Sequence, residues 1–485
     1  MKKKYYLYLI SLGLCLVFFI AYFTQSIELY NAHRTRGDLT NFAQAMWNTV
    51  HGRPMQNTFN YSIHNFWGDR NMEIPTNSNV FGIHFNPIIF LFVPFYYIFP
   101  VPQTLLIIQS LLTALGGFIV FLLAKDKLKN FYIAIIIQTL FLTYFTSVSA
   151  VLSEFHAFSL SIFFGLLLIY ANEKLNQKFY YISLALFLLV QENVAITAFF
   201  FGLYLILTSK NKRRGITTAL ISLVYFFLTI KVFIPQLSNY HTYIFESIYG
   251  NPLGSSIFNI IVNSIKNPVL FFKSVFTSQN ISYLSKLFFP IFPFFFFAPL
   301  ITLVGLSALS ANLLSTDLLL KSTTMHYESL SIPFFIYAVI LGINNFSKIS
   351  KKIFNINYNF IILFIVVIFM YTGYKKFTSP KLNFHLLLQS FYTPLDREMD
   401  DMIKLIPENS PVSTQDYISG HLTNRQNLYI FPVYYDKVKY LLLGKDNNYW
   451  PLTEKEQFGY IHQFKNNKEY RILKETSNFI LFSKN

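Results

Sequence analysis

Long apolar runs alternate with short polar connectors along most of this chain. Six runs approach the roughly 20 residues that a helix needs to cross a lipid bilayer. They cover residues 5–23, 104–124, 131–148, 216–234, 287–314 and 353–371, and shorter runs cover 157–170, 180–190, 194–207 and 332–343. The pattern predicts an α-helical protein that crosses a membrane many times.

The composition also indicates a membrane protein with many transmembrane helices. Only 13% of the 485 residues are charged, while 53% are hydrophobic and 19% are aromatic; soluble domains carry about 25% charge. The basic start and apolar core of residues 1–23 precede no small-residue cleavage site, which indicates an uncleaved anchor helix. Cys15 is the single cysteine, so the chain has no internal disulfide. The excess of Lys and Arg falls mostly in short connectors, which indicates membrane topology and no nucleic-acid partner.

Short basic connectors predict which ends of the helices face the cytoplasm, because Lys and Arg in short loops stay inside. These stretches are 2–4, 125–129, 172–178, 209–214 and 347–352. An even number of crossings must separate neighbouring stretches, so the Pro-broken segment 84–102 should not cross and 287–314 should form two spans. We therefore predict about eleven transmembrane helices in the cytoplasmic membrane, with the N-terminus inside and the C-terminus outside.

This topology gathers ionisable residues from five distant segments at or near the outer face. They are Asp38, His84, Glu154, His156, Glu192 and His326. An ionisable group at membrane depth is costly and is a functional candidate by default. The alternative for Asp38, Glu154 and His156 is a helix cap, and for His84 it is pairing of exposed backbone in the Pro-broken turn. For Glu192 it is a position at the helix–water boundary, and for His326 it is a solvated surface position.

The first predicted outer loop, 25–102, contains a segment with helical periodicity at 36–50. One stripe of this segment is apolar and consists of Leu39, Phe42, Met46 and Val50. We expect such an amphipathic helix to lie in the membrane interface with its apolar stripe toward lipid. Asp38 then stands at the start of the helix, either as its N-cap or as a functional carboxylate at the membrane surface.

The last part of the chain, 375–485, has more charge and shorter apolar runs. Short strand patterns alternate with helical ones, including a helix expected near 454–464, and this predicts a small α/β domain. We therefore divide the chain into a membrane domain at 1–374 and an outer domain at 375–485. Acceptor recognition or covering of the site is the expected role of the outer domain.

The order of these pieces resembles the GT-C superfamily of membrane glycosyltransferases, which use polyprenyl-phosphate-linked sugars. A closer similarity is to the membrane family called domain of unknown function 2079. It rests on five words in the same order: GDLTNFAQAMWNTVHGR (37–53), GIHFNPIIFLFVPFY (82–96), SEFHAF (153–158), QEN (191–193) and HY (326–327). This chain departs from the family pattern at Gly37, where Phe is usual, at Glu154, where Asp is usual, and at Ala157, where Pro is usual. It also departs at Gln191 and Asn193, where Lys and Asp are usual.

The resemblance implies an inverting sugar transfer, in which a carboxylate takes the proton of the acceptor hydroxyl. Asp38 matches the early acidic residue of the superfamily and is the predicted general base, with Glu154 as the second catalytic residue. A divalent metal ion held by Asp38, Glu154 and His156 is one expected means of stabilising the leaving phosphate. The alternative is that Glu154 and His156 form only a polar cap on the next span.

The same resemblance implies a set of substrate contacts and partners. The predicted substrate-binding residues are Arg36, Gln44, Trp47, Arg53, His84, Glu192, Lys321, His326 and Tyr327. Their cationic members are suited to a phosphate group. Expected partners are a polyprenyl-phosphate-linked sugar, membrane lipids, and an acceptor that is a glycan, a lipid or a protein.

Two other functions are compatible with this sequence. A transporter or flippase of lipid-linked substrates usually carries ionisable groups near the bilayer midplane, on broken helices in internal repeats. The predicted spans hold few such groups and show no repeat, which favours an enzyme. A noncatalytic assembly subunit with the same architecture is the other alternative, and the departures from the family words are its best support.

Overall fold

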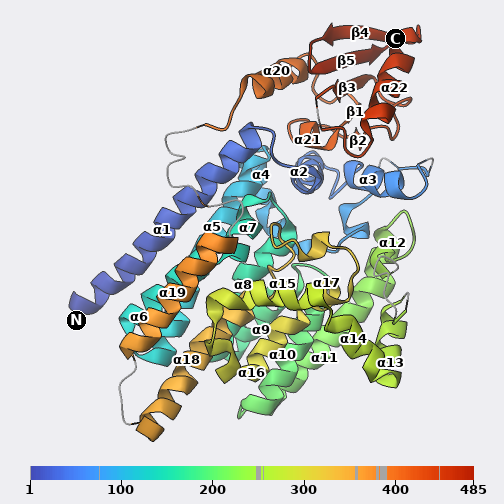
Figure 1. Cartoon of the computed structure of the whole chain (residues 1–485). Coiled ribbons are helices and arrows are strands. Elements are labelled where there is room, and N and C mark those ends of the chain that lie inside the picture. The colour runs from blue at the N-terminus through green and yellow to red at the C-terminus, as the bar shows by residue number, and fades with distance from the viewer. Residues whose placement is uncertain are drawn as a thin grey trace.

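The computed structural model describes most of the chain as a helical bundle with a small sheet beyond one end (Figure 1). The described residues are 2–70, 72–75, 77–246, 253–254, 256–354, 359–377, 382, 390–446 and 448–485. Part of the expected run at 353–371, residues 355–358, lies outside the described residues, as do 378–381 and 383–389 near the start of the predicted outer domain.

Helices dominate the described chain. The α-helices are α1 (Lys2–Asn31), α2 (Gly37–Val50), α3 (Phe59–Trp67), α4 (Val93–Ile98), α5 (Gln103–Leu128), α6 (Phe131–Thr143), α7 (Phe145–Leu152), α8 (Ser161–Lys174), α9 (Gln177–Leu188), α10 (Val194–Thr208), α11 (Lys212–Leu228), α12 (Ile234–Leu237), α13 (Ile257–Lys266), α14 (Pro268–Val275), α15 (Ser278–Phe288), α16 (Pro299–Ser307), α17 (Ser310–Leu314), α18 (Ile332–Phe354), α19 (Asn359–Phe377), α20 (Pro394–Ile403), α21 (Asp416–Ser419) and α22 (Glu454–Asn466). In the bundle, α5 contacts α1, α6, α8 and α18, and α10 contacts α11 and α16.

Fewer helices reach spanning length than the sequence predicts. Among the described residues, five helices are long and apolar enough to cross a membrane, or six if the bent pair α6 and α7 is one span. The five are Tyr6–Asn31, Gln103–Leu128, Ala157–Lys174, Lys212–Leu237 and Ile332–Lys352. By this measure the predicted number of about eleven is not reached, because several apolar runs are divided into shorter helices.

Prolines cause two of these divisions. Segment 84–102 forms the 3-10 helix η2 (Pro87–Phe92) followed by α4. At about 1.5 Å per residue, Pro87–Ile98 extends only ~18 Å, short of the ~30 Å apolar layer, which agrees with the expectation that it does not cross. Run 287–314 is fully described and contains only short helices, including η6 (Phe289–Ile291) and η7 (Phe294–Phe297). The two spans expected there are not seen, because Pro interrupts a helix where it cannot donate a hydrogen bond.

Three of the basic connectors meet at one end of the bundle. Lys127 Nζ lies 2.5 Å from Glu173 Oε2, and Lys174 Nζ lies 2.9 Å from Asp126 Oδ2. Arg214 Nη1 donates to the Asn172 carbonyl at 3.1 Å. The stretches 125–129, 172–178 and 209–214 therefore lie on one face of the bundle, as the topology requires.

The predicted amphipathic helix is present as α2, but its environment differs from the expected membrane interface. Leu39 and Met46 are 0% exposed, and so are Gln44 and Asn48 on the polar side. The prediction that its apolar stripe faces lipid is wrong, because protein covers both sides of the helix. The C-terminal part of the chain covers the polar side: Gln44 Nε2, for instance, donates to the Gln426 carbonyl at 2.9 Å.

Residues 394–485 contain a five-stranded sheet with strand order β2-β1-β3-β5-β4. The strands are β1 (Val412–Thr414), β2 (Leu428–Ile430), β3 (Tyr440–Gly444), β4 (Tyr470–Glu475) and β5 (Phe479–Lys484). Strands β1, β2 and β3 pair in parallel, and β5 pairs antiparallel with β3 and β4. The alternating strands and helices expected in this part of the chain are present, and we call residues 394–485 the C-terminal α/β region.

The outer edge of β2 is attached to α3 through hydroxyl groups. Thr58 Oγ1 donates to the Leu428 carbonyl at 2.8 Å, and the Ile430 amide donates to Ser62 Oγ at 2.8 Å. An edge strand otherwise presents unpaired N–H and C=O groups. These bonds fix the C-terminal α/β region on the first loop, directly beside α2 (Figure 1).

Close contact between α18 and η7 leads to a prediction about packing. A Cβ atom on Gly342 would lie 1.9 Å from the Phe294 carbonyl oxygen. We expect Gly342→Ala to force these segments apart and to lower the unfolding free energy by about 1–3 kcal/mol or more, seen as a lower melting temperature of the detergent-purified protein. Gly13→Ala is the control, since no atom lies within 4 Å of its added Cβ. Equal melting temperatures of the two variants would contradict this packing.

Candidate functional site

A cavity of about 350 Å³ lies between α2, residues 80–86 and the loops before α8, α10 and α18. Six of the predicted site residues line it: Asp38, His84, His156, Glu192, His326 and Tyr327. They come from separate segments of the chain, and the structure brings them together as the topology predicts. This cavity is the candidate active site.

Asp38 lies in the first turn of α2 but does not cap it. The N-cap position is Arg36, and no side chain of the capping residue bonds to the helix amides. The capping alternative for Asp38 is therefore wrong. Its Oδ2 lies 3.8 Å from His326 Nδ1, and burial raises the pKa of the Asp38 carboxyl, while the nearby imidazoles of His326 and His84 lower it.

Glu154 supplies the cap that α2 lacks. The amides of Arg36 and Leu39 both donate to Glu154 Oε2 at 3.0 Å, so this carboxyl accepts the orphan N–H groups of the first turn from another segment. Burial and the nearby Asp38 raise the pKa of Glu154 well above its usual value. The side chain is 3% exposed and does not line the cavity, so its contacts are those of a positioning residue.

His156 faces the cavity with a fixed tautomer. Its Nδ1 accepts a hydrogen bond from the Phe158 amide at 3.0 Å, and burial lowers the pKa of the ring well below its usual range. In a neutral imidazole whose Nδ1 accepts, Nε2 carries the proton. The ring stacks on His326 at 3.8 Å between centroids and presents an N–H group.

This tautomer bears on the predicted metal site. Asp38, His156 and His326 have ligand atoms within 4.8 Å of one another, so His326 takes the place that the sequence analysis assigned to Glu154. Metal ligation needs a nitrogen lone pair, however, and the lone pair of His156 already accepts the Phe158 amide. The set of Asp38, Glu154 and His156 therefore does not fit a metal ion.

His84 is held by Glu192. The imidazole Nδ1 lies 2.7 Å from Glu192 Oε1, and the Phe85 amide donates to Oε2 at 3.0 Å. Tyr243 adds a hydroxyl donor to Oε1 at 3.2 Å, and Phe245 stacks on the His84 ring at 4.3 Å. The Glu192 side chain is 1% exposed and that of His84 25%, so the imidazole is the member of the pair that solutes in the cavity can reach.

Five other predicted contacts do not line the cavity. Gln44 bonds Thr58 and the backbone near β2. Trp47 stacks with His51 at 4.0 Å and Arg53 lies over the same indole. Lys321 donates to the Ser315 carbonyl at 2.8 Å and Arg36 is exposed at the start of α2. None of these five is among the residues that line the cavity.

Sequence reasoning missed Asp416, which approaches α2 from the C-terminal α/β region. A Cβ atom added to Gly37 would lie 2.7 Å from Asp416 Oδ1, an oxygen that is buried without a hydrogen-bond partner. Burial and the nearby Asp38 raise the pKa of Asp416 to about 7. No local pattern could have found this residue, because its proximity depends on how the sheet packs on the first loop.

Two further groups near the cavity were also missed. His64 lines it, and burial lowers the pKa of this imidazole to about 4. The lining residue Asn312 donates to the Tyr283 hydroxyl at 2.9 Å, and this hydroxyl donates to Glu328 at 2.8 Å. Burial raises the pKa of Glu328 to about 7. Glu328 directly follows the HY word, and that position was the only signal for it.

The Glu154 cap predicts a local effect of substitution. Glu154→Ala should speed hydrogen exchange of the Arg36 and Leu39 amides by about 5–30-fold, the equivalent of a lost cap worth ~1–2 kcal/mol. Glu154→Gln keeps an acceptor oxygen and should change exchange less. Glu469→Ala, at an exposed position of the C-terminal α/β region, is the control. Unchanged exchange in Glu154→Ala would show that the cap does not hold α2.

Two solved structures share this fold over nearly the whole chain. ArnT from Cupriavidus metallidurans in the apo state gives a TM-score of 0.51 at 10% sequence identity, covering 98% of this chain and 97% of that chain. The same protein bound to undecaprenyl phosphate gives a TM-score of 0.50 with the same identity and coverage. At this identity the likeness shows the fold alone. No curated protein matches the chain in sequence.

A family comparison covers almost the entire chain. Residues 29–481 match the family described as Predicted membrane protein (DUF2079). The match begins near the end of α1, contains every segment that lines the cavity, and ends in β5. It confirms the family resemblance of the five ordered words, and the chain belongs to this DUF2079 family of predicted membrane proteins.

Proposed function

We propose that the protein is an inverting glycosyltransferase that moves a sugar from a polyprenyl-phosphate donor to an acceptor at the outer face of the membrane. The observation that carries the proposal is the Asp38 carboxylate, which lines a cavity together with four imidazoles: His64, His84, His156 and His326. The similarity of fold to ArnT, which has been solved with undecaprenyl phosphate, supports a polyprenyl phosphate as the lipid partner.

In the proposed reaction Asp38 is the general base. The acceptor hydroxyl attacks the anomeric carbon on the face opposite the phosphate and gives its proton to the Asp38 carboxylate. The bond from that carbon to the phosphate oxygen breaks, and its electron pair leaves with the polyprenyl phosphate. Inversion follows because the new glycosidic bond forms on the face opposite the old one. A raised pKa strengthens Asp38 as a base near neutral pH.

In this scheme imidazole groups stabilise the negative charge of the departing phosphate. His156 directs its Nε2–H to the cavity, and a fixed donor at the position where negative charge develops stabilises a transition state. His84, oriented by Glu192, adds a second imidazole to the cavity wall. Arg36 and Lys321 stay candidates for the phosphate of the lipid at the edge of the site, and no step requires a metal ion.

The location of the site at the outer face rests on charge. Helix α8 runs between the two ends of the bundle. His156 lies just before the helix, and Lys174, which belongs to a basic connector, is its last residue. If those connectors are cytoplasmic, then the cavity and the C-terminal α/β region face outward. The proximity of Asp416 to α2 supports a role for this region in completing the site from the acceptor side.

Removing the carboxylate of Asp38 tests the proposal. The product is first identified by mass spectrometry of envelope glycans and lipid-linked sugars from cells with and without the gene. Asp38→Asn should then lower transfer by at least about 100-fold, the usual contribution of a general base, with an unchanged melting temperature. Asp401→Asn, at an exposed position on α20, is the matched control and should retain activity.

Other outcomes of this experiment favour other functions. Full activity of Asp38→Asn would remove this residue from the mechanism. Movement of a lipid-linked substrate across sealed vesicles without a new glycosidic bond would identify a transporter. An unaltered set of glycans and lipid-linked sugars in cells without the gene would favour a noncatalytic subunit.

The raised pKa of Asp38 predicts a pH dependence. A general base acts only when deprotonated, so kcat/KM should fall as the pH drops through the pKa of Asp38. Because burial raises this pKa, the acid limb should lie above 3.8, the ordinary value of the group. The pH profile of kcat/KM measures it, and the residual activity of Asp38→Asn should lack this limb. An acid limb at or below the ordinary value would contradict the burial of the base.

A further inference from the structure

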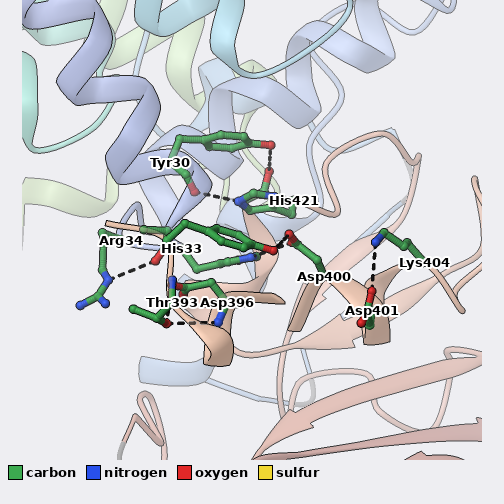
Figure 2. A network of polar contacts seen from close by, with 12 residues as sticks. Tyr30, His33, Arg34, Thr393, Asp396, Asp400, Asp401, Lys404 and His421 are labelled. Carbon is green, nitrogen blue, oxygen red and sulfur yellow. Dashed lines mark hydrogen bonds and ion pairs between the residues drawn. The ribbon is translucent and has the colours of Figure 1, made fainter. Parts of the chain in front are cut away.

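A second cluster of ionisable side chains lies where the end of α1 meets the C-terminal α/β region (Figure 2). His33 follows α1, Asp400 lies on α20 and His421 follows α21. One ligand atom from each of the three lies within 4.8 Å of the others. These residues do not line the cavity described above. They take part in no step of the proposed reaction.

The cluster is held together by stacking and by hydrogen bonds. The His421 ring lies between Tyr30, at 4.1 Å between centroids, and His33, at 3.9 Å. His33 Nε2 lies 2.9 Å from Asp400 Oδ1, and the Tyr392 hydroxyl donates to the other oxygen of this carboxylate at 2.6 Å. The side chains that meet here are therefore fixed by their neighbours, as the close-up in Figure 2 shows for the labelled ones.

Both imidazoles retain a nitrogen able to bind a metal ion. His421 Nε2 lies 2.9 Å from the Tyr30 carbonyl oxygen, which only accepts hydrogen bonds. The proton of the neutral ring is therefore on Nε2, and Nδ1 keeps its lone pair. The Asp400 carboxylate only accepts hydrogen bonds, so Nε2 of the neutral His33 ring carries its proton while the site is empty. His33 Nδ1 is buried without a hydrogen-bond partner, so the proton can move there when Nε2 binds an ion. This is the condition that His156 does not meet.

Burial lowers the pKa of His33, against the opposite effect of Asp400, and it lowers the pKa of His421 to about 4. The carboxylate of Asp400 supplies the negative charge that partly balances the ion.

We propose that His33, Asp400 and His421 form a divalent-metal site, of the nitrogen-and-oxygen type that zinc favours, which ties the end of α1 to the C-terminal α/β region. Two imidazoles and one carboxylate are a common three-residue zinc set, with water as the fourth ligand. A cavity of about 400 Å³ adjoins Asp400 and His421 and has room for that water.

The distances suit this assignment. Two ligand atoms that each lie about 2.1 Å from one ion are at most ~4.2 Å apart, so small side-chain rotations suffice to complete the site. His33 and Asp400 are 367 positions apart in sequence, and the ion would join the membrane bundle to the region that covers α2. The site thereby stabilises the cover of the candidate active site without taking part in its chemistry.

The experiment uses the full-length protein purified in detergent and freed of metal by a chelator. It is then titrated with Co²⁺, whose visible absorption reports nitrogen and oxygen ligands. Every protein tested carries His326→Gln, which we call the background. This substitution removes one imidazole from the candidate active site and so reduces Co²⁺ binding there. We expect one Co²⁺ per chain and a rise in melting temperature when Zn²⁺ is added.

His421→Gln in this background should raise the Kd for Co²⁺ by at least about 10-fold and abolish the rise in melting temperature. Asp400→Asn is the second variant, used in case His421→Gln fails to fold, because it keeps the shape of the side chain. His462→Gln on α22 is the control, since its ring contacts only the neighbouring Asn466 in the described structure. Undiminished binding in both test variants, equal loss in the control, or no Co²⁺ bound by the background protein would overturn the proposal.

Discussion

The hydrogen bonds between the Glu154 carboxyl and the first turn of α2 are the contact on which the candidate site depends. The first amides of a helix have no acceptor within the helix, and leaving them unpaired in a buried place costs about 1–3 kcal/mol each. Glu154 pairs two of them at once. It therefore fixes both the position and the rotation of α2, and Asp38 reaches the cavity wall as a consequence.

Neighbouring groups give chemically identical imidazoles different properties. A backbone amide makes His156 a hydrogen-bond donor toward the cavity, and Glu192 fixes the orientation of His84. At the other cluster, a carbonyl oxygen leaves His421 with a free lone pair. Under the two proposals, the same side chain serves a phosphate group in one place and a metal ion in another, because each ring nitrogen takes the role that its partner leaves open.

The C-terminal α/β region converts a surface helix into a buried one. Its backbone bonds the polar side of α2, and α3 in turn completes the edge of β2. It also brings Asp416 to the start of α2, where three carboxyl groups, those of Asp38, Glu154 and Asp416, share one helix N-terminus. Burial raises the pKa of all three, and the nearby Asp38 further raises the pKa of Glu154 and of Asp416. The C-terminal α/β region therefore adds a buried carboxyl group to the site from a distant part of the sequence.

The amino-acid sequence by itself determined the properties that depend on neighbouring residues. These are the apolar helices, the extent of α2 at Gly37–Val50, the alternation of strands and helices in the C-terminal α/β region, and membership of the DUF2079 family. The distribution of Lys and Arg also predicted that Asp38, His84, Glu154, His156, Glu192 and His326 would meet, and all of them but Glu154 line the cavity. Only the tertiary structure decided that Glu154 caps a helix and that Gln44 and Arg53 do not line the cavity. It also decided that Asp416 approaches α2 and that His421 approaches the end of α1. The reason is physical: periodicity and charge act over a few residues, whereas a hydrogen-bond partner is set by distances that no local pattern records.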